Sequence, residues 1–173
     1  MNRKTAVALA AGVVVQAGLV AAYLAVEHGR RPDTPALQPV DPQPAPPLVL
    51  MDREGREQRL DAFRGRPVVL YFWASWCPAC RGHLPEVVGE GRHAREAEVV
   101  AAGLDRDWAL ADRVAGGLDD VHLAGPGTAD AWGLTQLPTV ILVDAEGVIR
   151  ARGPADRVSL ADVLAVAASL SSR

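Results

Sequence analysis

The chain has 173 residues, a formal net charge of −3 and 49% apolar residues. This length suits one folded domain with an accessory segment, and the apolar content is enough for a hydrophobic core. Basic and acidic residues are mixed along the chain without a basic block, so we expect no nucleic-acid partner. The two cysteines, Cys77 and Cys80, are too few for a secreted scaffold held together by several disulfides.

The N-terminal region contains an uncharged apolar run from residue 5 to residue 26. A membrane-spanning helix needs roughly 20 such residues. Two basic residues precede the run and favour a cytoplasmic N-terminus, although two more follow it at 30 and 31. We therefore expect a cytoplasmic stub at 1–4 and an uncleaved transmembrane signal anchor at 5–26. The alternatives are a signal peptide cleaved near residues 20–22 and a buried core helix, for which the run lacks a polar face.

A proline-rich segment follows the apolar run. Between residues 31 and 47 the sequence has seven prolines, at positions 32, 35, 39, 42, 44, 46 and 47. Because proline fixes φ and removes a hydrogen-bond donor, we expect neither helix nor strand there. We interpret residues 27–47 as a stiff linker, with a ligand for a proline-binding domain as the alternative, and expect the folded domain at 48–173.

The apolar pattern after residue 47 predicts alternating strands and helices. We expect an apolar run at 48–51, strands at 68–73, 99–104, 121–124, 139–143 and 148–151, and helices at 78–97, 107–114 and 159–170. The run at 68–73 is typical of a buried strand, and the turn at 144–147 joins the last two strands into a hairpin. This order predicts an α/β domain with a mixed central sheet and helices on both faces.

The cysteine pair is the candidate redox centre. A disulfide between Cys77 and Cys80 would close a very small ring and stabilise the fold little, which favours a reactive role. Cys77 follows a buried strand and precedes a helix, whose first amides would stabilise a thiolate. Pro78 suits the first helical position. We therefore expect Cys77 to attack a disulfide and Cys80, one turn further on, to release the partner.

A proline before a predicted strand is the second element of this site. Leu137, Pro138 and Thr139 lead into the strand at 139–143. A proline can open a strand, although its ring removes a donor from the ladder. We interpret Pro138 as a cis proline that faces the sulfurs, and a simple turn proline is the alternative.

Metal binding and peroxide chemistry are alternatives to this interpretation. A structural zinc site needs four ligands, and the chain has no second cysteine pair, so we expect no metal. A copper carrier would use Cys77, Cys80 and His122, but such carriers usually have three residues between their cysteines. A thiol peroxidase would place its attacking cysteine in a loop rich in proline and threonine, which this sequence lacks.

The sequence resembles the TlpA/ResA-like branch of the thioredoxin superfamily. The resemblance covers roughly residues 47–168 and rests on Phe72 to Arg81, Pro85, Leu137 to Thr139 and Asp144 to Gly147. It implies a thioredoxin-like fold and a thiol–disulfide oxidoreductase that reduces client proteins outside the cytoplasm, in many members during cytochrome c maturation.

The resemblance also implies a bacterial inner-membrane protein with one span, a periplasmic catalytic domain and a membrane thiol donor that recharges it. No cofactor is expected beyond the redox-active disulfide Cys77–Cys80. The backbone at Leu137 would pair with a bound substrate beside cis Pro138.

Three residues depart from the pattern of this family. Tyr71 stands where thioredoxins have a buried acid, His83 where many relatives have Glu, and Thr139 where the cytochrome-maturation branch often has an acidic residue. His83, one turn beyond the second cysteine, is either a group that tunes the sulfurs or an exposed helix residue. Trp76, beside the first cysteine, forms either a docking surface for substrate or a shield over the site.

Overall fold

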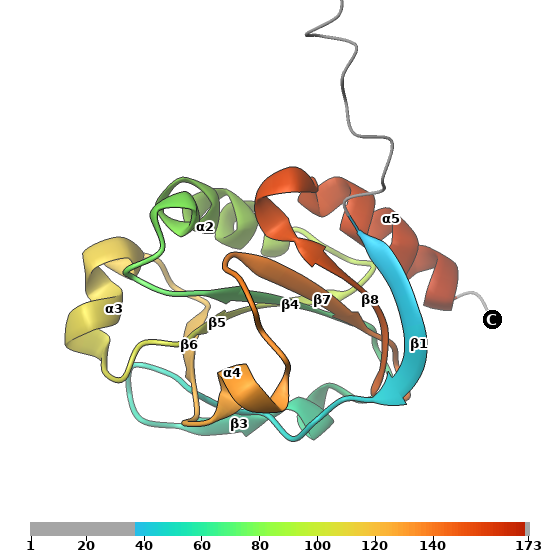
Figure 1. Ribbon diagram of the computed structural model, residues 1–173, viewed down its shortest axis with the longest axis horizontal. Helices are drawn as coiled ribbons and strands as arrows, with labels where there is room; N and C mark the ends of the chain where they lie inside the picture. The colour runs from blue at the N-terminus through green and yellow to red at the C-terminus, as the bar shows by residue number, and fades with distance from the viewer. Residues whose placement is uncertain (1–36, 172–173) are drawn as a thin grey trace, which may run out of the picture. The chain divides into compact units, whose positions relative to one another are not determined.

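The computed structural model describes residues 37–171, and Figure 1 shows their arrangement. In chain order the elements are β1 (Gln38–Pro44), β2 (Val49–Met51), β3 (Glu57–Arg59), η1 (Leu60–Phe63), β4 (Val68–Trp73), α2 (Pro78–Gly91), β5 (Glu98–Gly103), α3 (Trp108–Ala115), β6 (Val121–Ala124), α4 (Thr128–Ala131), β7 (Thr139–Val143), β8 (Val148–Pro154), η2 (Ala155–Arg157) and α5 (Leu160–Ser171). The strands form one sheet in the order β1-β8-β7-β4-β5-β6-β2-β3. Strand β5 pairs parallel with β4 and β6, and the other pairs are antiparallel, so the predicted mixed sheet is confirmed.

Strand β4 lies at the centre of the sheet and is buried along its whole length. Because successive side chains of a strand point to opposite faces, β4 contributes to two cores. On the helical face its residues Val69, Tyr71 and Trp73 pack with α2, α3 and α5. On the opposite face Val68, Leu70 and Phe72 pack with residues around η1 and α4. Figure 1 shows α2 and α5 on one side of the sheet and α4 on the other, so helices cover both faces as predicted.

Strand β1 shows that the prediction of no strand between residues 31 and 47 is wrong. Residues 38–44 pair antiparallel with β8, with Pro39 opposite Ala151 and Pro44 opposite Val148, and the register shifts between Pro39 and Gln43. Proline is tolerated here because β1 is an edge strand, where a missing N–H need not interrupt a ladder. The sheet therefore begins before the predicted domain start at 48.

The predicted stub at 1–4, the anchor at 5–26 and the first part of the linker lie outside the described residues. Within residues 37–171, none of the helices combines the length and the apolar character needed to cross a bilayer.

Helix α2 ends at Gly91, earlier than the predicted end at 97. Glycines at 89 and 91 weaken the last turn. A Cβ at position 91 would lie 2.9 Å from the Val99 side chain, so the helix end lies close against β5. This packing requires glycine and fixes the end of α2 that is remote from the cysteines.

Candidate active site

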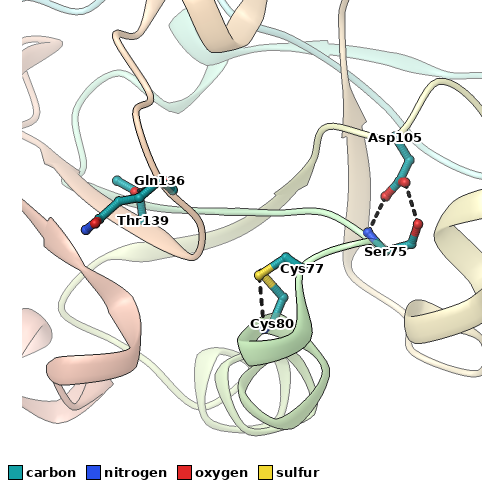
Figure 2. Close-up of a disulfide and its surroundings, with 6 residues drawn as sticks. All are labelled: Ser75, Cys77, Cys80, Asp105, Gln136 and Thr139. Atoms are coloured by element: carbon teal, nitrogen blue, oxygen red, sulfur yellow. Dashed lines mark hydrogen bonds between the residues drawn. A yellow bond between two sulfur atoms is a disulfide. The ribbon is translucent and has the colours of Figure 1, made fainter.

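The two cysteines lie at the start of α2, immediately after the loop that leaves β4 (Figure 2). They form a disulfide, with their Cα atoms 5.3 Å apart. Cys77 is the N-cap of the helix, and its Sγ accepts a hydrogen bond of 3.2 Å from the backbone N–H of Cys80. Pro78 occupies the first turn as predicted. The first sulfur thus faces a helix amide that would stabilise a thiolate once the disulfide is reduced.

Both cysteines are shielded in this oxidised arrangement. Cys77 is 3% exposed and Cys80 is 0% exposed. Cys77 is therefore the more accessible of the two sulfurs, but it is more buried than expected for a residue at the exposed end of a helix. Trp76 is 66% exposed and lies directly before Cys77. An indole that packed over the site as a shield would lose more of its surface, so this exposure favours the docking interpretation of Trp76.

The Leu137–Pro138 peptide bond is cis, as predicted. Strand β7 starts at Thr139, which lies opposite Phe72 on β4. Pro138 therefore lies at the end of the sheet where the loop to the cysteines begins, and Figure 2 shows the segment from Gln136 to Thr139 across from the disulfide. Leu137 is half-buried and packs against both cores.

The chain bends tightly where it enters β7. The Thr139 hydroxyl donates to the Gln136 carbonyl oxygen at 2.7 Å. The backbone N–H of Ala155 donates to the Pro138 carbonyl oxygen at 3.0 Å. Thr139, which stands where an acid was expected from the family pattern, thus fixes the shape of this bend.

Ser75 and Asp105 form a buried pair that the sequence interpretation missed. The Asp105 carboxylate accepts from the Ser75 backbone N–H at 2.8 Å and from the Ser75 hydroxyl at 2.7 Å (Figure 2). The two residues follow β4 and β5, which are neighbouring parallel strands. Functional groups in open α/β sheets gather outside the carboxyl ends of such strands, and this rule could have drawn attention to both residues.

His83 and Tyr71 line one cavity of about 330 Å³ between α2, η2 and α5. The His83 side chain is half-buried and has no hydrogen-bond or ion-pair partner among residues 37–171. Tyr71 is 1% exposed, and its hydroxyl has no partner among the described residues. Burial, together with the charges of Asp156 and Glu86, raises the pKa of Tyr71 well above its ordinary value. The phenol therefore stays protonated and cannot replace a buried carboxylate as a base.

His122, the third residue considered for copper, lies on β6 and lines a different cavity from that of Tyr71 and His83. Burial lowers its pKa below the ordinary histidine value, against the opposing charges of Asp52 and Asp120. Over residues 37–171, no group of three or more His, Cys, Asp or Glu side chains is arranged to hold a metal ion. The described part of the chain thus gives no support to the copper alternative.

The arrangement favours two-electron sulfur chemistry. A thiolate at Cys77 would face the amides of α2, and Cys80, to which Cys77 is bonded, lies in the first turn of the same helix. The exposed Trp76 and the bend at Leu137 and Pro138 lie at the same end of the sheet. A disulfide brought to this end would meet the pair in the geometry that thiol exchange requires.

Comparisons with known proteins agree with this chemistry. A family profile described as the AhpC/TSA family matches residues 42–114. The thiol:disulfide interchange protein DsbE of Allochromatium vinosum is 33% identical over 129 residues, which cover 68% of this chain and 70% of that protein. The thiol-disulfide oxidoreductase ResA of Geobacillus thermodenitrificans is 30% identical over 115 residues, or 61% of this chain and 64% of that protein.

The same agreement holds for solved structures. The crystal structure of a thiol:disulfide interchange protein DsbE from Chlorobium tepidum matches with a TM-score of 0.64 and 26% identity, covering 76% of this chain and 99% of that one. Fold and sulfur chemistry together therefore define a thioredoxin-fold protein of the thiol–disulfide oxidoreductase class. Within this class, the chain belongs to the TlpA/ResA-like family, since it is 33% identical to a DsbE protein over 70% of that protein's length.

Proposed function

We propose that this protein reduces disulfide bonds of client proteins outside the cytoplasm through the Cys77/Cys80 dithiol. The observation that carries the proposal is the hydrogen bond from the Cys80 amide to the Cys77 sulfur at the start of α2. Hydrogen bonds and the positive end of a helix favour the anionic form of a thiol, which is the nucleophile. The names of the DsbE and ResA relatives support the same reaction type.

The reaction proceeds in two exchange steps. The Cys77 thiolate attacks one sulfur of the client disulfide, forms a mixed disulfide and releases the other client sulfur as a thiolate. Cys80 then loses its proton and attacks the Cys77 sulfur, which re-forms the Cys77–Cys80 disulfide and releases the second client thiolate. Two electrons pass to the client, and a membrane thiol donor returns two electrons to the pair. No cofactor beyond the disulfide takes part.

Trp76 and the Leu137–Pro138 bend hold the client during these steps. Trp76 offers an exposed apolar surface beside the attacking sulfur. The backbone at Leu137 pairs with an extended client segment next to the cis proline. The protein is held at the outer side of the bacterial inner membrane by residues 5–26, and its clients include apocytochromes c.

Trapping of mixed disulfides tests this function. Cys80→Ser leaves the first step intact and blocks the second, because a serine hydroxyl stays protonated and is a poor nucleophile. Client proteins from an extracytoplasmic extract should accumulate as covalent adducts on Cys77 that a reductant removes. Mass spectrometry of the adducts then identifies the class of client.

Cys77→Ser is the matched control, and it should trap far fewer clients because the attacking sulfur is lost. Equal trapping by the two variants, or none by Cys80→Ser, contradicts the assigned roles. Retention of copper(I) after desalting and consumption of peroxide, measured on the unmodified protein, test the carrier and peroxidase alternatives directly.

A further inference from the structure

Asp105 is a buried carboxylate for which the two exchange steps have no use. It is 6% exposed and lies directly after β5. Both of its oxygens accept hydrogen bonds from Ser75, one from the backbone N–H and one from the hydroxyl. Two donated bonds suit a carboxylate anion, since an anion accepts at both oxygens.

This carboxylate holds the loop that carries the attacking cysteine. Ser75 is two residues before Cys77, and the Cys77 backbone N–H donates to the Ala74 carbonyl oxygen at 3.1 Å. The loop therefore runs from the Asp105 contact to the helix N-cap as one tight turn, which Figure 2 shows beside the disulfide. The carboxylate is thus joined, through a residue two positions before Cys77, to the loop on which a second negative charge forms on reduction.

No cation within residues 37–171 forms an ion pair with Asp105, and its two hydrogen-bond donors are neutral. The other charged groups on the first turns of α2 and beside Asp105 are Arg81, His83, Glu86, Arg106 and Asp107, and η2, which contacts α2, adds Asp156 and Arg157. All except the half-buried His83 are exposed, so solvent and salt screen them. On the β7 side, residues 136–139 carry no charge. Among the groups named, Asp105 is therefore the buried carboxylate, and solvent screens its charge the least.

We propose that Asp105 is a positioning residue that fixes the 74–77 loop through Ser75 and that its charge destabilises the Cys77 thiolate, which keeps the dithiol reducing. The proposal rests on the function proposed above. It gives a structural reason why electrons pass from the dithiol to the client disulfide rather than in the opposite direction. A thiolate stabilised in the reduced state makes a pair more oxidising, as in strongly oxidising dithiol proteins. A like charge has the reverse effect, because it disfavours the ionised form of the reduced pair.

Asp105→Asn tests the charge with little change of shape. The amide oxygen can still accept from the Ser75 N–H, and the amide nitrogen can donate to the Ser75 hydroxyl, which also accepts. The ionisation midpoint of Cys77, followed by thiolate absorbance against pH in reduced protein, should fall by about one pH unit. The equilibrium of the variant with glutathione, measured at a pH above the Cys77 midpoint of the unmodified protein, should shift about tenfold toward the dithiol. This shift corresponds to a rise of about 30 mV in the reduction potential.

Asp107→Asn and Ser75→Ala are the matched controls. Asp107 is exposed and caps α3 through the Leu110 N–H, a role that asparagine also performs, so its variant should leave both readouts unchanged. Ser75→Ala removes one hydrogen bond and keeps the charge. It should lower the thermal unfolding midpoint without lowering the ionisation midpoint of Cys77, and this readout remains available even if Asp105→Asn fails to fold.

An unchanged ionisation midpoint of Cys77 in folded Asp105→Asn overturns the inference. An equal fall of that midpoint in Ser75→Ala also overturns it, because the position of the loop rather than the charge of Asp105 would then determine the pKa of Cys77. These outcomes differ from failure of the proposed function. In that case the unmodified protein itself would show no reversible dithiol–disulfide equilibrium with glutathione.

Discussion

The two faces of strand β4 contribute to different cores, although both consist of buried residues from the same run. On the helical face, Tyr71 and Trp73 share a core with the disulfide, and the Tyr71 side borders the cavity of about 330 Å³. On the opposite face, Phe72 packs against Trp132 with ring centroids 5.5 Å apart, in a core without either cysteine. Alternation along one strand thus separates the chemistry from the packing that supports it, and substitutions on the two faces should have separable effects.

The largest effect is expected on the opposite face. Phe72→Ala removes a fully buried ring from the centre of that core and should lower the free energy of unfolding by about 3–5 kcal/mol. Urea denaturation followed by tryptophan fluorescence measures the loss. The redox equilibrium of the folded fraction with glutathione should stay at the wild-type value. A shift in that equilibrium would show that the two faces are not independent.

A smaller, pH-dependent effect is expected on the helical face. The raised pKa of Tyr71 means that the folded protein keeps the phenol neutral where the unfolded chain ionises. Its contribution to stability is therefore present below pH 10 and is lost as the pH rises further, by about 1.4 kcal/mol per pH unit. Tyr71→Phe should flatten this alkaline loss in urea titrations at pH 9, 10 and 11. Identical slopes in the two proteins would contradict a buried neutral phenol.

The smallest effect is expected at the start of α5, which covers the helical face through Leu160, Val163 and Ala167. The Ser159 hydroxyl accepts from the Asp162 N–H at 3.1 Å and donates to the Asp162 carboxylate at 2.7 Å. Ser159→Ala should cost about 1 kcal/mol of unfolding free energy, and Ser159→Thr should retain most of it. Thermal denaturation distinguishes them, and an equal loss in both would show that the cap contributes nothing.

The sequence predicted the parts of the molecule that depend on local pattern. The buried run at 68–73, the hairpin turn at 144–147 and the cysteines at a helix start all follow from neighbouring residues. The cis bond at Pro138 follows from two features together, a proline directly before a strand and a cysteine pair elsewhere in the chain.

The parts that the sequence did not predict depend on distant partners. Strand β1 exists because β8, over a hundred residues later, offers an unpaired edge. The Ser75–Asp105 bonds join residues thirty positions apart, and neither residue type is unusual in a loop. The short polar strand β3 at Glu57–Arg59 has no apolar alternation, and it forms because β2 lies beside it.

The edges of the sheet have a consequence for behaviour at high concentration. An open edge strand offers unpaired N–H and C=O groups to other copies of the chain and can start polymerisation. Here one outer strand, β1, contains Pro39, Pro42 and Pro44, which have no N–H to offer. The other outer strand, β3, is three residues long and carries Glu57 and Arg59. Within residues 37–171 neither end of the sheet offers a long neutral ladder, so copies crowded together should not add strands to one another edge to edge.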